Sequence, residues 1–354
     1  MDIIVTIFAT IIALGALIII HELGHFLMAK LVGVKVEKFS MGFPPILWRK
    51  KIGETEYSIG IPYGGFVKMK GDEADYEPGE EGPEPDSFYG KSVGPRALII
   101  SGGVIFNIIL AFLLFFAVNM FWGIGEAITD HAVVGMINPG MPAEDLGVEV
   151  GDTIIAIDGL EVETWMDMVE LVHALPDSMV SVTWRHDGET ITDSIITYAR
   201  VQPGYDKPIG LIGIGPASRN ISLSFGEAVK YAALQEVNVF AEMVFFIYRS
   251  VTGNTSMKEL GGVVMIAQMA GKTAKMGISK YLIFIAFLSI NLAFINLLPF
   301  PVFDGGHLVF LGLEAIRGKR LPLRIRSAIQ NVGIVMILML IVLVTSNDIM
   351  RFFR

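Results

Sequence analysis

The sequence predicts a mainly α-helical protein that crosses a membrane about four times, with a membrane-associated β-hairpin and a small α+β domain. Three observations predict this fold class. The 354 residues are 53% hydrophobic and only 18% charged, which is too little charge for a soluble chain of this size. Apolar runs long enough to cross a bilayer recur along the chain. Between them, one stretch alternates short β-rich runs with turn residues.

The first transmembrane helix is predicted within residues 1–32. An uninterrupted apolar run extends from Ile3 to Ile20, close to the about 20 residues that a helix needs to cross the hydrocarbon core. A secretory signal peptide is the alternative interpretation. It would have a basic start and a small-residue cleavage site, whereas this chain opens with Met1-Asp2 and continues into a polar motif.

That motif is His21-Glu22-Leu23-Gly24-His25. In a helix, the i, i+4 spacing places both imidazoles on one face, one turn apart. Two neutral imidazoles so placed can hold Zn²⁺, and the adjacent Glu22 carboxylate can act as a general base. A chance occurrence of the motif is the alternative. However, ionisable groups at membrane depth cost roughly 3 kcal/mol each and rarely persist without a function.

Residues 33–96 are expected to form a loop on the cytoplasmic side that includes a β-hairpin. Basic residues follow the first helix closely, which by the positive-inside rule places this side in the cytoplasm and the N-terminus outside. Residues 54–69 alternate in polarity, and we expect a hairpin that turns at Pro62-Tyr63-Gly64-Gly65 and lies against the membrane beside the first helix. Residues 72–86 are acidic and rich in proline and glycine, which predicts a solvated loop.

A second transmembrane helix is predicted at residues 97–123. Asn107 is its polar exception, and such a residue often only hydrogen-bonds a neighbouring helix. Residues 124–203 then change character, with four β-rich runs, a helical stretch near 165–174 and turns at Asn138-Pro139-Gly140, Asp158-Gly159 and Asp187-Gly188. No Lys or Arg lies between Arg96 and Arg185, so we expect this domain on the outer side of the membrane.

Residues 204–280 are expected to form interfacial amphipathic helices. The stretch 225–248 has helical apolar periodicity but carries charged residues, which favours a helix at the outer interface over a span. Its charged residues are Glu227, Lys230, Glu236 and Glu242. The stretch 260–276 is compatible with an interfacial or a partly inserted segment.

A third transmembrane segment is predicted within residues 281–316, and it ends in the pattern N-x-x-P-x-P-x-x-D-G-G from Asn296 to Gly306. Two nearby prolines break a helix at depth, which is tolerated only where protein or a cavity lines the break. We expect unwound backbone to point Asp304 sideways at a site. Basic residues follow and return the chain to the cytoplasm, before a last transmembrane helix within 317–354. The motif histidines and Asp304 should therefore share the cytoplasmic half of the membrane.

These residues predict a catalytic zinc site with three protein ligands and one open position. His21, His25 and Asp304 would be the ligands and Glu22 the base. His307 competes with Asp304, because zinc prefers imidazole, but Asp304 follows the break more directly. The chain has no cysteine, so thiolate ligands are excluded. Its net charge of −9 argues against a nucleic-acid partner.

The motifs together resemble the site-2 protease family of intramembrane zinc metalloproteases, in particular the bacterial regulator-of-sigma-E protease group. The resemblance covers nearly the whole chain. It is carried by HELGH, by GGFVKM in the expected hairpin, by SGGVIFN in the second span, by the stretch NPGMPAEDLGVEVGDTIIAIDG, which is similar to a PDZ domain, and by NLLPFPVFDGG. A departure is the single PDZ-like module where relatives of the sigma-E type have two.

The resemblance implies Zn²⁺ held by His21, His25 and Asp304, with Glu22 as catalytic base. It also implies that Asn296 and Asn291 handle an unwound substrate helix, and that the strand around Gly64 and Gly65 pairs with substrate. Expected substrates are single-span proteins of the bacterial inner membrane, already trimmed by another protease and often anti-sigma factors. The PDZ-like domain would then be extracytoplasmic.

Two other functions remain open at this stage. A membrane zinc carrier would need ligands spaced along a path, and the sequence shows one cluster. A scaffold with a PDZ-like module and a structural metal would need a site closed by four ligands, with His307 as the fourth.

Overall fold

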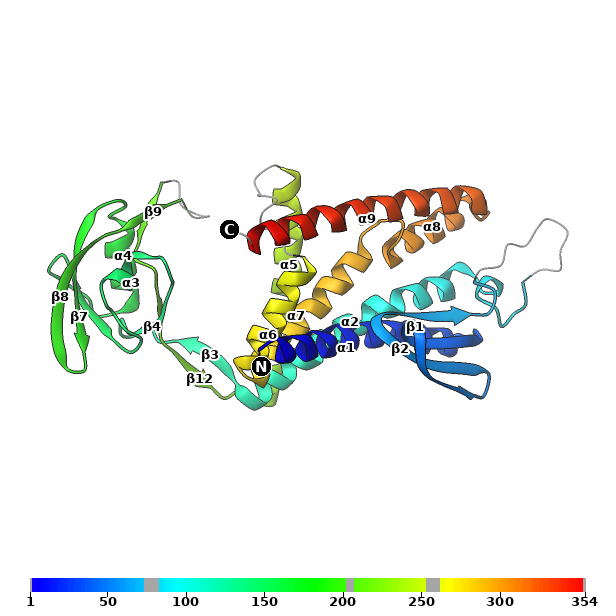
Figure 1. Cartoon of the computed structure of the whole chain (residues 1–354), viewed down its shortest axis with the longest axis horizontal. Coiled ribbons are helices and arrows are strands. Elements are labelled where there is room, and N and C mark those ends of the chain that lie inside the picture. Colours follow the sequence, from blue (N-terminus) through cyan, green and yellow to red (C-terminus); the bar gives the residue numbers. More distant parts are fainter. Residues whose placement is uncertain (1, 73–82, 202–206, 253–261, 353–354) are drawn as a thin grey trace. The chain divides into compact units, whose positions relative to one another are not determined.

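The structure is a computed structural model that describes residues 2–72, 83–201, 207–252 and 262–352. Most of the acidic loop predicted at 72–86 therefore lies outside the described residues. The chain folds as two compact units, which are Met1–Phe121 with Ser224–Arg354, and Trp122–Leu223. Figure 1 shows both units, with most of their elements labelled.

The first unit is mainly helical. Its helices are α1 (Asp2–Leu31), α2 (Val93–Trp122), α5 (Phe225–Val251), α6 (Val263–Lys275), α7 (Ile278–Leu297), α8 (Asp304–Arg317) and α9 (Leu323–Phe352). Among the described residues, four segments are long and apolar enough to cross a membrane. These are Ile3–Leu31, Val93–Trp122, Ile278–Leu297 and Arg324–Leu343. The prediction of about four transmembrane helices agrees with this result.

Glycines allow α1 and α2 to touch through their backbones. A Cβ atom added to Gly24 would lie 2.1 Å from the carbonyl oxygen of Gly102, and one added to Gly102 would lie 2.6 Å from the carbonyl oxygen of Gly24. Small residues at such a crossing let two apolar helices approach closely and gain dispersion contacts. The crossing places α2 directly beside the motif histidines.

The first half of α1 is covered by α6 and α7. Ala9 and Ala13 are buried against Ala270 and Phe284, and the Tyr281 hydroxyl donates a hydrogen bond to the Ala9 carbonyl oxygen at 2.5 Å. The expected interfacial or inserted segment at 260–276 is thus a helix packed on α1. Whether it lies at the interface stays a prediction, as it does for α5.

A short linker separates α7 from α8. Gly305 and Gly306 permit it, because a Cβ atom at Gly305 would lie 2.3 Å from the Leu297 carbonyl oxygen and one at Gly306 would lie 2.1 Å from that of Phe300. The break expected at the two prolines is present. However, Asp304 is the first residue of α8, so the expectation that it lies in unwound backbone was wrong.

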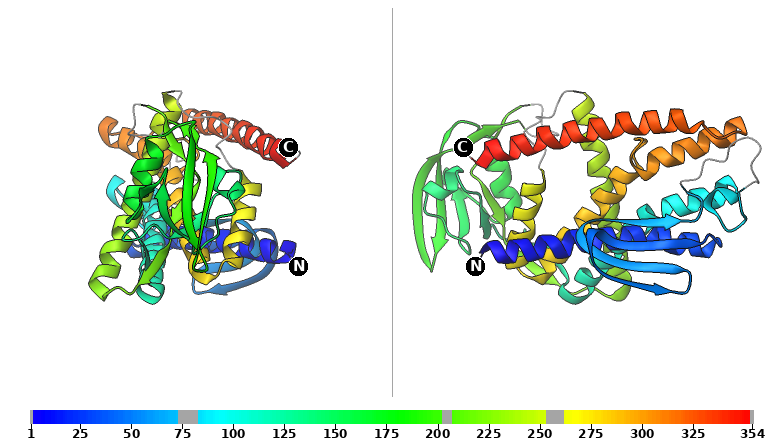
Figure 2. Two further views of the ribbon diagram at one scale, coloured as in Figure 1. Left: turned by 90° about the vertical axis from the view of Figure 1, so that its left-hand side faces the viewer. Right: turned by 45° about the vertical axis from the view of Figure 1, so that its right-hand side comes forward.

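Two strands lie beside α1 in the first unit (Figure 2). They are β1 (Val36–Ile52) and β2 (Thr55–Met69), joined at Gly53, whose φ of 61° lies in the left-handed region. Pro62-Tyr63-Gly64-Gly65, the predicted turn, lies inside β2. The turn of the hairpin is therefore earlier in the chain than the sequence predicted.

The predicted hairpin within 54–69 was also wrong in its pairing. Residues 36–41 of β1 pair with 65–69 and also with 56–59 of β2. The two arms of the predicted hairpin therefore lie on either side of 36–41 instead of pairing with each other. The charges and two prolines of β1 concealed it as a strand, and no pairs are formed between Phe43 and Trp48, where these prolines lie.

The second unit is a small α+β domain. Its strands are β3 (Ile124–Ala127), β4 (Val134–Ile137), β5 (Thr153–Ile157), β6 (Leu160–Glu161), β7 (Met179–His186), β8 (Glu189–Ile196), β9 (Tyr198–Arg200), β10 (Ile209–Leu211), β11 (Ile214–Pro216) and β12 (Ser218–Ile221), and its helices are α3 (Pro142–Asp145) and α4 (Trp165–His173). Four strands form one sheet in the order β6-β5-β7-β8. The Asp187-Gly188 turn has positive φ at both residues, 46° and 89°, as a tight hairpin requires.

The end of this unit corrects one domain boundary. Residues 204–280 were expected to be helical, but β10, β11 and β12 lie at their start and pair with β9, β4 and β3. The unit therefore extends to Leu223 rather than to residue 203. These strands are only three or four residues long, so they carry no periodicity from which a sheet could be predicted.

Candidate metal centre

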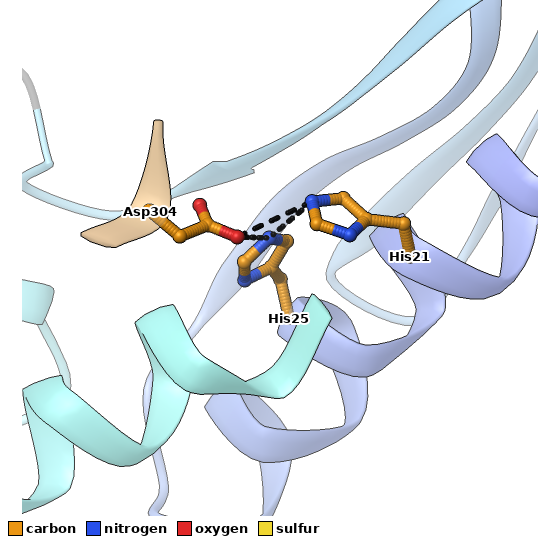
Figure 3. A group of neighbouring side chains, drawn as sticks. All are labelled: His21, His25 and Asp304. Atoms are coloured by element: carbon orange, nitrogen blue, oxygen red, sulfur yellow. Dashed lines mark hydrogen bonds and ion pairs between the residues drawn. The ribbon is translucent and has the colours of Figure 1, made fainter. Parts of the chain in front are cut away.

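The structure brings His21, His25 and Asp304 together (Figure 3). The Asp304 Oδ2 atom lies 3.4 Å from His21 Nε2 and 3.6 Å from His25 Nε2, and the two Nε2 atoms are 3.2 Å apart. The histidines come from α1, and the aspartate comes from the first turn of α8. More than 270 residues of sequence separate the histidines from the aspartate.

The geometry of these atoms fits a zinc ion. Four tetrahedral ligands at about 2.0–2.1 Å from zinc lie about 3.3 Å from one another, close to the three separations above. Asp304 Oδ2 is buried and has no hydrogen-bond partner, which is costly for a carboxylate oxygen unless a cation compensates it. The donor set of two imidazoles and one carboxylate is that of a catalytic zinc site.

Two neighbouring groups orient the imidazole rings. His25 Nδ1 lies 2.9 Å from the Ile99 carbonyl oxygen, so Nδ1 carries the proton and Nε2 is left free to coordinate. His21 Nδ1 lies 3.2 Å from the side-chain amide of Asn107. Asn107 is fully buried in α2; its Nδ2 makes this contact, and its Oδ1 has no hydrogen-bond partner. Asn107, the polar residue of the second predicted span, thus belongs to the site. The sequence alone left its role undecided.

Gly103 leaves space for both rings. A Cβ atom there would lie 2.4 Å from His21 Cε1 and 2.6 Å from His25 Nε2. Because real Cβ atoms do not approach other atoms so closely, any larger residue would displace a histidine. The SGG segment of α2 therefore shapes the metal centre, a role that its sequence alone did not reveal.

Glu22 lies beside the cluster and lines a cavity of about 760 Å³ together with His25 and Asp304. β2 packs closely against the Glu22 side chain, because a Cβ atom at Gly65 would lie 2.9 Å from Glu22 Cγ. Val67 also lines this cavity. Gly65 and the segment after it therefore border the cavity beside Glu22.

The other predicted site residues differ in position. Asn296 Nδ2 lies 3.4 Å from His21 Nε2, at the edge of the cluster. Asn291 donates to the Phe287 carbonyl oxygen of its own helix and is not brought to the site. His307 lines the cavity but does not belong to the group that can hold a metal. Gly64 packs under the Phe43 ring.

A charged cluster at another part of the cavity wall was not predicted. Arg96 of α2 forms two hydrogen bonds with Glu314 of α8, at 2.6 and 3.1 Å. Arg320 and Arg326 contact Tyr89 of η1 (Phe88–Gly90). Up to 237 residues separate these groups, and no local motif marks them, so sequence reasoning had no signal for them.

The profile of peptidase family M50 matches residues 9–340. A Clostridium acetobutylicum protein that carries the name "Putative zinc metalloprotease" is 34% identical over 342 residues, covering 96% of each chain. The chain belongs to peptidase family M50. The Bacillus subtilis protein named "Regulator of sigma-W protease RasP" is a further relative of this M50 protease, 29% identical over 98% of this chain and 99% of its own length.

Family membership confirms the resemblance to the site-2 proteases and makes the chain a zinc-dependent intramembrane protease. The PDZ likeness of the second unit is not established in the same way. A PDZ domain from a Listeria monocytogenes protein aligns with 26% of the M50 protease and 92% of its own chain at 23% identity. The TM-score of 0.22 is too low to assign the fold.

Proposed function

We propose that this M50 protease hydrolyses a peptide bond in or near the transmembrane segment of single-span proteins in a bacterial inner membrane. The observation that carries the proposal is the grouping of His21, His25 and Asp304 within an apolar helical unit. A metal centre enclosed by membrane-spanning helices is reached by substrates that themselves lie in the lipid. Expected substrates are anti-sigma factors or similar proteins already trimmed by another protease.

In this proposal His21, His25 and Asp304 hold the zinc ion, and Glu22 is the catalytic base. Zinc, when bound, supplies a Lewis acid that polarises the scissile carbonyl and makes water more acidic. The Glu22 carboxylate takes the proton from the attacking water and gives it to the leaving amine. Its position beside the ligands and on the cavity wall supports this role.

A substrate helix hides its carbonyl groups in hydrogen bonds, so it must unwind before cleavage. We place the extended form along residues 65–69 of β2. This segment pairs with 36–41 on one side, and Val67 and Met69 line the cavity. Main-chain pairing with a strand edge stabilises an extended peptide. Asn296, at the edge of the metal cluster, contacts the unwound segment, whereas the position of Asn291 gives its proposed role no support.

The distribution of basic residues supports an orientation. Lys and Arg residues follow α1 and lie between α8 and α9, so these ends face the cytoplasm. The metal centre then lies toward the cytoplasmic half, and the second unit is extracytoplasmic and PDZ-like.

The experiment co-expresses tagged single-span membrane proteins with the wild type or with Glu22→Gln. The variant should keep its zinc and lose cleavage by at least about 100-fold, the usual contribution of a general base. Zinc content of the purified proteins is the control for the fold. Cleavage by Glu22→Gln at the wild-type rate would contradict the proposed mechanism. Absence of cleavage of every single-span candidate by the wild type would contradict the proposed substrate class.

A further inference from the structure

The inference concerns an arginine cluster on the wall of the cavity that holds Glu22, His25 and Asp304. We use this name for Arg96, Arg320 and Arg326, which surround the Tyr89 ring. Their guanidinium carbons lie 5.5, 4.4 and 5.7 Å from its centroid. All three side chains line the cavity. The cluster and the metal centre therefore share one continuous space.

The cluster holds more donors than the protein uses. Arg96 has a side chain that is only 3% exposed, and Glu314 satisfies its terminal nitrogens, yet its Nε is buried without a partner. The Nε of Arg326 is also buried and unpaired, although its Nη1 donates to the Tyr89 hydroxyl. Buried donors without acceptors are costly. An acceptor from outside the protein would satisfy them.

The local charge has the sign that favours an anion. Among the described residues, Glu314 forms the ion pairs of the cluster, with Arg96 and with Arg320. Arg326 donates instead to the neutral Tyr89 hydroxyl. Three guanidinium groups thus share one ion-paired carboxylate, which leaves the cluster positively charged. Guanidinium groups match the flat, two-oxygen shape of a carboxylate better than an ammonium does.

We propose that the arginine cluster binds the new α-carboxylate of the cleavage product, which draws that end of the chain away from the metal centre. This inference rests on the proposed function. Hydrolysis of a peptide bond creates one carboxylate, and it does so beside Glu22. A carboxylate is also a good zinc ligand, so a product that stays in place blocks the next substrate. The cluster offers the carboxylate a second position within the same cavity.

The direction of release agrees with the location of the cluster. Arg320 lies between α8 and α9, and Arg326 lies near the start of α9, in the basic region that is placed on the cytoplasmic side. When a substrate has its N-terminus in the cytoplasm, its N-terminal fragment is released to that side. The new carboxylate is the C-terminus of this fragment and leaves the cavity last. The cluster therefore meets the end of the released fragment rather than its beginning.

The test measures peptide binding by fluorescence anisotropy on the full-length Glu22→Gln protein in detergent. The probes are a labelled short leucine–alanine peptide with a free C-terminal carboxylate and the same peptide as a C-terminal amide. Each is measured in the Glu22→Gln background and with Arg326→Gln, Arg326→Lys or Arg324→Gln added. Arg324 is a matched control, because it is an exposed arginine one half-turn away that does not line the cavity.

The acid peptide should bind about tenfold more tightly than the amide, as one charge-assisted contact provides. Arg324→Gln should keep this ratio, Arg326→Gln should reduce it to about twofold or less, and Arg326→Lys should give an intermediate ratio. Equal binding of acid and amide, or an unchanged ratio in Arg326→Gln, would overturn the proposal. Because binding is read without cleavage, failure of the proposed substrate class would appear separately in the co-expression experiment.

Discussion

Asn107 shows how one buried amide controls a metal ligand. Its Nδ2 lies 3.2 Å from His21 Nδ1, and its Oδ1 has no partner. A flip of the amide exchanges these two atoms. With Oδ1 toward the ring, the amide accepts the Nδ1 proton and leaves the Nε2 lone pair facing His25 and Asp304. The second partner of a ligating histidine fixes its tautomer and ring orientation.

Replacement of Asn107 by leucine should therefore weaken zinc binding by about 10- to 100-fold, the usual effect of losing such a partner. Zinc content after dialysis against a graded chelator measures this. Asn119→Leu is the control, because Asn119 is an equally buried amide of the same helix that donates to Gln235 instead. Equal zinc loss in both variants would show that the effect comes from general destabilisation of α2.

The choice between Asp304 and His307 is also tested at this scale. Asp304→Ala should remove most of the bound zinc, since one of three ligands is lost. His307→Ala should keep it, because His307 is outside the ligand group. Metal analysis of the two purified proteins decides the question. Loss of zinc in His307→Ala alone would reverse the assignment.

At the scale of single elements, the contact between α1 and α2 is built from glycines. Gly103→Ala should disturb the metal centre although alanine is the better helix former. The added methyl group would overlap both imidazoles, and metal–ligand distances in a well-formed site lie within about 0.2 Å of their usual values. We expect at least about tenfold weaker zinc binding with helix content unchanged by circular dichroism.

Gly94→Ala is the matched control for this prediction. Gly94 lies in the first turn of the same helix, and a Cβ atom there meets nothing within 4 Å. This variant should bind zinc as the wild type does. Wild-type zinc affinity in Gly103→Ala would show that α2 can shift away from the histidines.

The elements also show what the sequence could predict. The histidine motif and the four apolar helices were predictable because their signals are local, in spacing and in length. Asp304 was predictable because its break motif is local too, although its place in α8 was not. The pairing of β1 with both arms of β2 depends on contacts between distant segments. The arginine cluster has the same origin and was missed for the same reason.

At the scale of the whole molecule, the chain contains a unit that has its own core. Trp122–Leu223 encloses Trp184, Ile154 and Val182, which are 2% exposed or less. A segment with a separate core of this size is able to fold alone. The fragment 122–223 should unfold cooperatively when followed by tryptophan fluorescence. A gradual, non-cooperative change would show that the unit needs the helical part.

The stability of this fragment should depend on pH through His186. Its Nδ1 hydrogen-bonds the buried Asp152 carboxylate at 2.8 Å, which raises the pKa of His186, and the charges of Asp187 and Glu149 raise this pKa further. Folding thus favours the protonated ring. This stabilisation is complete below the unfolded pKa of about 6.5 and is lost as pH rises through the higher folded pKa.

The melting temperature of the fragment should therefore fall as pH increases above about 6.5. His186→Gln should remove this decline, and His131→Gln should keep it. Burial lowers the pKa of His173, so its effect has the opposite sign and belongs to the range below its unfolded pKa. A melting temperature that rises with pH above neutrality would contradict the role of His186.

Because Asp304 is the first residue of α8, a tilt of this helix about its other end moves the Asp304 carboxylate. Glu314, held by Arg96, is ten residues further on, a distance of about 15 Å along the helix axis. If α8 pivots at Glu314, a tilt of about 4° carries the carboxylate about 1 Å sideways, which is several times the range of about 0.2 Å within which metal–ligand distances lie. A small tilt of α8 about its Glu314 end is therefore enough to move the Asp304 carboxylate into or out of reach of a bound metal.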